Sequence, residues 1–108
     1  MEFSAIEKMF ISKISSAMDI IDNYKLHYIE YGLFGSVARG DYNASSDLDI
    51  VMIFKKLPKR AVISKLRLEL EEIDCDLAIL LVDNFNEPKN AFHKDVKKDY
   101  RRIKCYGE

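Results

Sequence analysis

The chain has 108 residues, of which 48% are hydrophobic and 32% are charged, a balance typical of one globular domain. Its 17 Lys and Arg residues are offset by 18 Asp and Glu residues, and the net charge of -1 argues against a broad nucleic-acid-binding surface. No apolar stretch approaches the roughly 18 residues needed to span a membrane. The N-terminus lacks the features of a signal peptide, so we expect a cytoplasmic protein with a single domain over residues 1–108.

The cysteines and histidines do not have the pattern of a metal site. Cys75 and Cys105 are distant in a chain without an export signal, which favours two reduced thiols. Neither His27 nor His93 lies at ligand spacing from a cysteine. Surface or half-buried positions are the simpler interpretation of both histidines.

Residues 4–22 are predicted to form the first helix. Ser4 and Glu7 have the spacing of a capping box, in which each side chain satisfies a backbone amide at the helix start. Apolar residues recur at spacings of three and four and form a stripe along this segment: Phe3, Ile6, Phe10, Ile14, Ala17 and Ile21. So wide a stripe indicates either a well-buried helix or one that also contacts another chain, in a homo- or hetero-oligomer.

The next segment combines a strand with a turn. Residues 26–34 are rich in aromatic and β-branched types and predict a strand, which Gly35 and Ser36 end. Residues 37–39 predict a short helical turn. Residues 41–46 are polar and predict a loop.

A strand, a helix and another strand follow. Residues 47–54 predict the second strand, and Pro58 suits the first turn of the helix after it. That helix is indicated by four apolar residues at helical spacing: Val62, Leu66, Leu70 and Ile73. Residues 75–82 are apolar enough for a central strand.

Residues 83–88 predict a loop, residues 89–100 a last helix with Phe92, Val96 and Tyr100 on one side, and residues 102–106 a short closing strand. This order predicts an α/β (α+β) fold, in which helices pack on a small mixed sheet. The helical connection between the second and third strands favours a parallel pair with a right-handed crossover. The short connection between the first two favours an antiparallel pair.

Asp47 and Asp49 are the most informative polar residues. In a strand they point to the same face, about 7 Å apart along the backbone, where two carboxylates repel each other unless a cation lies between them. Taken alone, an Asp-x-Asp pattern more often marks a turn or a strand end. Here a buried strand follows at once and aspartate is a poor strand former, which favours an Mg²⁺ site.

A third carboxylate would allow two metal ions about 3.5–4 Å apart, the arrangement used for in-line phosphoryl displacement. Asp76, at the mouth of the third strand, is the preferred residue. Asp74 is two residues before Asp76 and would point to the same face, so it is the alternative third carboxylate, although it lies nearer the end of the preceding helix.

Gly35 and Ser36 follow a strand, where a glycine lets the backbone approach a phosphate and a hydroxyl donates one more hydrogen bond. Alone, this pair is a weak signal because turns use it often. Arg39 could face phosphate, or it could pair with Asp41 or Asp47.

Together, Gly35–Asp41 (GSVARGD) and Ser46–Ile50 (SDLDI) resemble the signature of the DNA polymerase beta-like nucleotidyltransferase superfamily. Within it the chain resembles the minimal nucleotidyltransferases (MNT), including the MntA-type antitoxins. The motif covers about sixteen residues, and the predicted order of elements extends the resemblance over nearly the whole chain.

The resemblance implies a nucleotidyltransferase palm fold and transfer of a nucleotidyl group, AMP in particular, from ATP with release of pyrophosphate. Gly35 and Ser36 would bind the nucleotide triphosphate, and Arg39 is the further candidate for a phosphate contact. Asp47, Asp49 and Asp76 would be the catalytic residues and hold Mg²⁺, with two ions expected. Family members of this size are often encoded beside a HEPN-domain protein, where they act as antitoxins, and some transfer AMP to a tyrosine hydroxyl of that toxin.

Two alternatives remain open. The domain could neutralise a partner by complex formation, with weak or absent catalysis, as the wide apolar stripe of the first helix suggests. It could also modify a small molecule such as an aminoglycoside, although so short a chain leaves little room for a separate substrate pocket.

Overall fold

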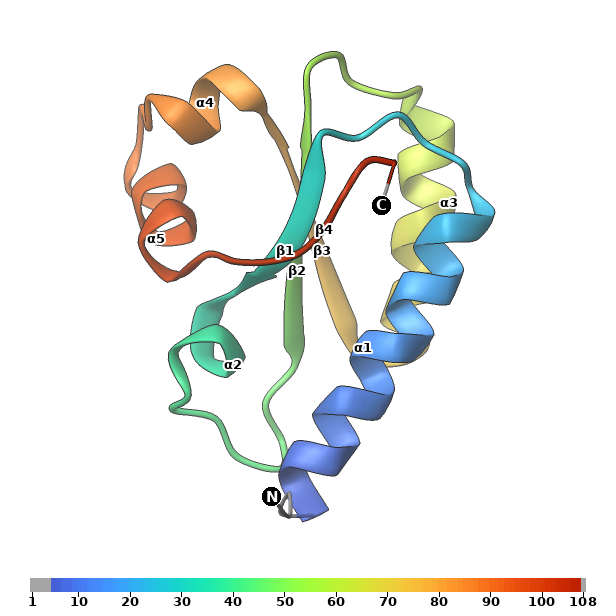
Figure 1. Cartoon of the computed structure of the whole chain (residues 1–108), viewed down its shortest axis with the longest axis vertical. Coiled ribbons are helices and arrows are strands. Elements are labelled where there is room, and N and C mark those ends of the chain that lie inside the picture. The colour runs from blue at the N-terminus through green and yellow to red at the C-terminus, as the bar shows by residue number, and fades with distance from the viewer. Residues whose placement is uncertain (1–4, 108) are drawn as a thin grey trace.

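Figure 1 shows the computed structural model of the chain, which describes residues 5–107. The elements in chain order are α1 (Ala5–Asn23), β1 (Glu30–Phe34), α2 (Gly35–Arg39), β2 (Leu48–Phe54), α3 (Arg60–Glu71), β3 (Cys75–Leu81), α4 (Val82–Asn86), α5 (Ala91–Asp99) and β4 (Arg101–Cys105). The proposed capping residue Ser4 lies outside the described residues. None of the helices in the described part is both long and apolar enough to cross a membrane.

The four strands form one mixed sheet in the order β3-β2-β1-β4. Strand β2 runs parallel to β3, and β1 is antiparallel to both β2 and β4. The predicted fold class and both predicted strand pairings are therefore confirmed. The parallel pair is joined through α3, as a crossover connection requires.

Helices cover both faces of the sheet, with α1 and α3 on one side and α2, α4 and α5 on the other (Figure 1). Because side chains alternate along a strand, Ile50 and Met52 of β2 belong to the larger core under α1 and α3. Val51 and Ile53 join a smaller cluster with Val96 of α5. Asp49 lies two residues before Val51, so its side chain points to the same face of the sheet as Val51 and Ile53, toward α2, α4 and α5.

The first strand is shorter than its sequence predicts. Residues 26–34 were expected to be extended throughout, but β1 begins at Glu30. A turn after α1 places Lys25 in the left-handed region at φ 51°, and the chain then crosses from the helix to the sheet. Tyr28 packs edge-on against Tyr31, with ring centroids 5.0 Å apart. This aromatic ring is therefore contributed to the core by a loop residue and not by a strand residue.

The prediction of a loop at residues 83–88 is wrong, because α4 occupies Val82–Asn86. Phe85 packs edge-on against Tyr100, with ring centroids 4.9 Å apart, and this burial stabilises a helix too short to form alone. The helix after β2 begins at Arg60 with Lys59 as its N-cap residue, so Pro58 precedes the first turn and does not lie in it.

The boundaries of the other helices differ slightly from prediction. Helix α5 begins at Ala91, because the side chain of Asn90 accepts a hydrogen bond from the amide of His93 (2.8 Å) and so caps the helix. On α1, the stripe residues Phe10, Ala17 and Ile21 are buried, whereas the nearby Ile11 is 47% exposed. Phe3 and the side chain of Ile6, which the stripe also included, lie outside what the structure describes.

Candidate functional site

The positions of the predicted site residues lie together at one end of the sheet, where β1 ends and where β2 and β3 begin. Asp49 of β2 lies between two neighbours in register, Phe34 at the end of β1 and Asp76 at the start of β3. Neighbouring strands are about 4.8 Å apart, so Asp49 and Asp76 are adjacent on one face. Asp47 precedes β2 and shares this face by strand alternation.

Gly35 lies directly against the side chain of Asp49. Its φ is +75°, a left-handed conformation that favours glycine. A Cβ at this position would overlap the Asp49 carboxylate. The glycine therefore lets a carboxylate of β2 lie directly against the backbone at the start of α2.

The charged form of Asp49 is electrostatically unfavourable in the folded protein. Burial raises its pKa above the usual value, and the negative charges of Asp76 and Asp47 raise it further, against an opposing effect of Arg39. Asp47 and Asp76 themselves are exposed. A half-buried carboxylate beside two others is an arrangement that a bound cation would relieve.

The donor set fits a hard divalent cation, because it consists of carboxylate oxygens at a solvent-accessible edge. Within residues 5–107, no three His, Cys, Asp or Glu side chains already stand close enough to surround an ion. The exposed side chains of Asp47 and Asp76 would therefore have to turn toward Asp49 on binding. The cradle that Gly35 provides for Asp49 is the preformed part of the site.

Asp74 is oriented differently from Asp76. It follows α3 in the left-handed conformation, with φ 58°, and its carbonyl oxygen accepts a hydrogen bond from the amide of Leu48 (3.2 Å). Its carboxylate lies 3.8 Å from Nζ of Lys13 on α1, the helix on the opposite face of the sheet. The geometry therefore favours Asp76 over Asp74 as the neighbour of Asp49.

Ser36 lies in the first turn of α2, directly after Gly35. The helix ends at Gly40, whose φ of 85° lets its amide donate to the carbonyl oxygens of Ser36 (3.0 Å) and Val37 (3.2 Å). This Schellman-like end makes α2 a compact turn. The start of α2 lies beside Asp49 through Gly35, and Ser36 is the next residue of the helix.

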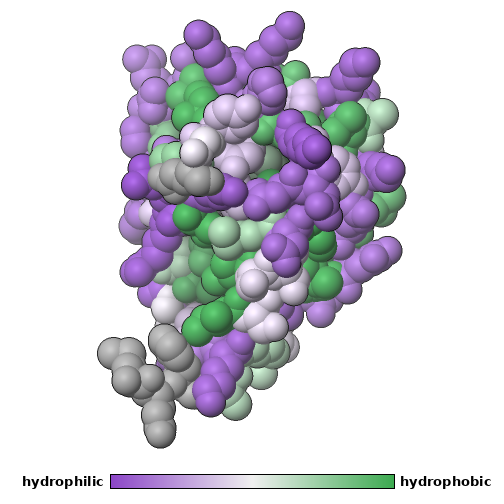
Figure 2. Space-filling model, turned by 45° about the vertical axis from the view of Figure 1, so that its right-hand side comes forward, coloured by the Kyte–Doolittle hydropathy of each residue, from purple (hydrophilic) through white to green (hydrophobic). Residues whose placement is uncertain are grey.

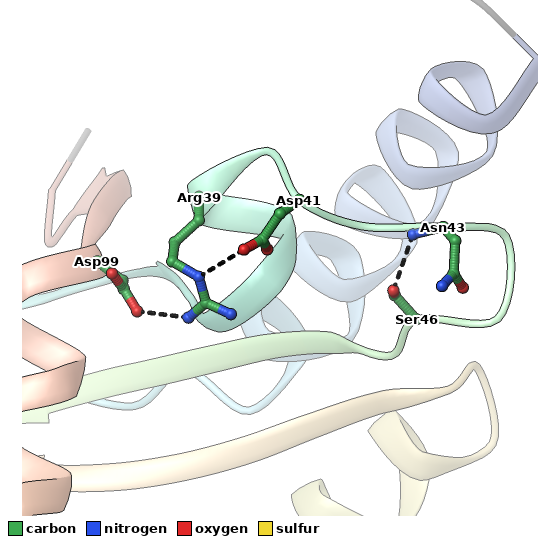
Figure 3. A network of polar contacts seen from close by, with 5 residues as sticks. All are labelled: Arg39, Asp41, Asn43, Ser46 and Asp99. Carbon is green, nitrogen blue, oxygen red and sulfur yellow. Dashed lines mark hydrogen bonds and ion pairs between the residues drawn. The ribbon is translucent and has the colours of Figure 1, made fainter.

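The loop that carries Asp47 is ordered by its own side chains (Figure 3). The amide of Asn43 donates to Oγ of Ser46 (3.0 Å), and Oδ1 of Asn43 accepts from the amide of Ser45 (2.9 Å). The predicted polar loop is present, and these bonds determine where the chain enters β2.

Arg39 forms two ion pairs at the rim of this site (Figure 3). Its Nε donates to Oδ2 of Asp41 (3.1 Å), and its Nη1 donates to Oδ2 of Asp99 at the end of α5 (2.8 Å). The pair with Asp41 is one of the three predicted possibilities, the others being phosphate and Asp47. Asp99 was missed, since nothing in the sequence indicates that two residues so far apart meet.

Comparison with known proteins supports a single family. The family model described as "Polymerase beta, Nucleotidyltransferase" matches residues 11–108. No curated protein sequence matches the chain.

Several solved structures share the fold. A protein from Sulfolobus solfataricus described as a nucleotidyltransferase has a TM-score of 0.65 at 22% identity, over 97% of this chain and 91% of that one. A toxin–antitoxin structure with AMP-PNP has a TM-score of 0.61 at 16% identity, over 89% and 73%. A structure described as a minimal nucleotidyltransferase has a TM-score of 0.58 at 18% identity, over 95% and 100%.

Proposed function

The chain belongs to the polymerase beta-type nucleotidyltransferase family, and on that premise we propose that it transfers a nucleotidyl group, AMP, from ATP to a hydroxyl of a partner protein. The observation that carries this proposal is the contact of Gly35 with Asp49, beside Asp76. It joins the turn suited to a triphosphate to the carboxylates suited to a cation.

In the proposed reaction the acceptor hydroxyl oxygen bonds to the α-phosphorus of ATP. The bond from that phosphorus to the oxygen bridging it to the β-phosphate breaks, and pyrophosphate leaves with the electron pair. Asp76, exposed at the mouth of β3, would accept the hydroxyl proton. Gly35 and Ser36 would position the triphosphate through backbone amides and the serine hydroxyl, so positioning supplies much of the rate enhancement.

Asp47, Asp49 and Asp76 would hold Mg²⁺, two ions in the full arrangement. When bound, the metal would neutralise the charge that develops on the phosphates. Binding would also relieve the repulsion among the three carboxylates, which is why a site that is unfavourable when empty is consistent with this role.

The partner would be a HEPN-domain toxin, and the chain its MntA-type antitoxin in the cytoplasm. One observation supports this extension: a toxin–antitoxin structure shares the fold.

Label transfer from ATP tests the proposal. The chain, Mg²⁺ and a HEPN-domain protein as the acceptor are incubated with ATP labelled either at the α- or at the γ-phosphate. Nucleotidyl transfer predicts label in the partner from α-labelled ATP only. Label from γ-labelled ATP would indicate phosphoryl transfer, and absence of label from both would exclude this acceptor.

A second function, neutralisation of a partner by binding alone, is favoured by the face that carries α1 and α3. Figure 2 shows hydrophobic side chains gathered among hydrophilic ones on this side of the molecule. Ile11 of α1 is 47% exposed and Leu68 of α3 is 63% exposed. A groove of about 640 Å³ between the two helices is lined by residues that include Ile20, Tyr24 and Val62. Such a face is suited to a protein partner.

The two functions separate in one experiment. If binding alone neutralises the toxin, replacing both Asp47 and Asp49 by Ala leaves neutralisation intact, because neither residue lies on the α1 and α3 side. If transfer is required, the double variant still binds the toxin but no longer neutralises it.

A further inference from the structure

A groove of about 430 Å³ lies beside the site, between α2 and α5. Gly35 and Arg39 line it on one side, and Phe92, Asp95, Lys98 and Asp99 of α5 line it on the other. Gly35 also contacts the Asp49 carboxylate, so this groove adjoins the proposed phosphate site at Gly35 and Ser36. Its volume lies in the range of small-molecule sites.

Phe92 provides a flat apolar surface in this groove. The residue is 48% exposed, although a large aromatic side chain is usually buried more deeply. The ring of Phe34 at the end of β1 contacts it edge-on, with centroids 6.0 Å apart and planes at 89°. Phe92 is thus supported from the sheet while much of its surface remains accessible, as a stacking platform requires.

The charges of the groove suit an uncharged ligand better than a phosphate. Arg39 is engaged by the Asp99 carboxylate, whose side chain is only 9% exposed. Lys98 and Asp95 are both exposed and carry opposite charges. A carboxylate such as Asp95 repels phosphate but accepts hydrogen bonds from hydroxyl and amino groups.

We propose that this groove is the nucleoside subsite of the chain, in which the base stacks on Phe92 while sugar hydroxyls or base amino groups donate to Asp95. The subsite rests on the proposed nucleotidyl transfer and extends it, because it assigns the part of the nucleotide that Gly35, Ser36 and the carboxylates leave unassigned. The triphosphate would lie at Gly35, and the nucleoside would extend from there along α5.

The test compares the binding of ATP with that of inorganic tripolyphosphate, both with Mg²⁺, by isothermal titration calorimetry. Tripolyphosphate has the phosphates but no nucleoside. The wild-type chain is expected to bind ATP more tightly. Phe92→Ala should weaken ATP binding about fivefold or more, because the stacked base loses its platform, and should leave tripolyphosphate binding unchanged.

Three further variants control for folding and for loss of apolar surface. Phe92→Leu keeps apolar contact with Phe34 but has no ring, so it should behave as Phe92→Ala does. Phe92→Tyr keeps the ring and should retain ATP affinity. Leu68→Ala removes a side chain that is 63% exposed on α3, across the sheet, and should leave both ligands unaffected.

The outcomes distinguish the subsite from the proposed function. If ATP and tripolyphosphate bind equally well, or if Phe92→Leu binds ATP as the wild type does, the subsite is wrong and the phosphate site stands. If neither ligand binds the wild-type chain, both proposals fail. If Phe92→Leu impairs transfer to the partner without weakening ATP binding, the groove holds the acceptor and the nucleoside assignment is overturned.

Discussion

Arg39 and Asp99 are joined by a hydrogen bond of 2.8 Å between Nη1 and Oδ2, although 60 positions separate them in the chain. The same guanidinium also donates to Asp41. One side chain thereby ties α2, which carries Gly35 and Ser36, to the end of α5. We regard Asp99 as a positioning residue, because it acts on the site through Arg39.

Asp99→Asn should weaken ATP binding about two- to fivefold, since partly exposed ion pairs are individually weak. The variant is expected to raise KM more than it lowers kcat, and Asp99→Glu should restore part of the affinity. Glu87→Gln removes an exposed carboxylate just after α4 and serves as the matched control. Equal kinetics in Asp99→Asn and Glu87→Gln would contradict a positioning role.

Gly35→Ala should abolish ATP binding, because its Cβ would overlap the Asp49 carboxylate at a position with φ +75°. Gly40→Ala is a matched control, since its φ is +85° and open space surrounds the added atom. Both variants bear a backbone strain of about 1 kcal/mol or more. The difference between them in Mg²⁺-dependent ATP affinity measures what Gly35 contributes beyond backbone strain, through its contact with Asp49 and its place beside the triphosphate. If the two variants bind ATP alike, that contact has no functional role.

The stability of the metal-free protein should depend on the protonation of Asp49. Burial and the charges of Asp76 and Asp47 raise its pKa above the usual 3.8, so the folded state binds this proton more tightly than the unfolded chain does. The stabilisation from this group is present at low pH and is lost as the pH rises through the raised pKa.

Asp49→Asn is neutral at every pH and should therefore escape this loss. With EDTA at about pH 7, we expect a Tm a few degrees above that of the wild type, with the difference vanishing toward about pH 4. Mg²⁺ should stabilise the wild type and not the variant. Thermal unfolding followed by circular dichroism measures both effects, and parallel pH profiles for the two proteins would contradict the electrostatic interpretation.

The two cysteines should differ sharply in reactivity. Burial raises the pKa of Cys75 to about 11, so few thiolates form at about pH 8, whereas Cys105 is only half-buried. A thiol reagent is expected to modify Cys105 in the native protein and Cys75 only after denaturation. Mass spectrometry of wild type and Cys105→Ser would detect this, and rapid native labelling of Cys105→Ser would show that Cys75 is accessible.

The sheet and the alignment of the carboxylates could be predicted because they depend on local pattern. Strand alternation placed Asp47 and Asp49 on one face, and the helical crossover made β2 and β3 parallel, which brings Asp76 beside Asp49. Both inferences need only the period of a strand and the length of a connection.

Features that depend on tertiary contacts could not be predicted in this way. The helix at Val82–Asn86 is stabilised by the packing of Phe85 on Tyr100, a partner that lies beyond the next helix. Asp99 reaches Arg39 only because α5 folds back over the sheet. The overlap that a Cβ at Gly35 would cause arises from Asp49, a residue of β2 that is distant in the sequence.

The central claim is that the carboxylates of β2 and β3 form a metal–triphosphate site with Gly35 and Ser36. Asp76→Asn and Asp74→Asn test it most directly, because they make the same chemical change two residues apart. We would measure ATP affinity with Mg²⁺ and with EDTA by isothermal titration calorimetry. The structure predicts that Asp76→Asn loses most of the Mg²⁺-dependent affinity while Asp74→Asn binds as the wild type does. Equal affinities in the two variants, or the reverse order, would contradict the claim.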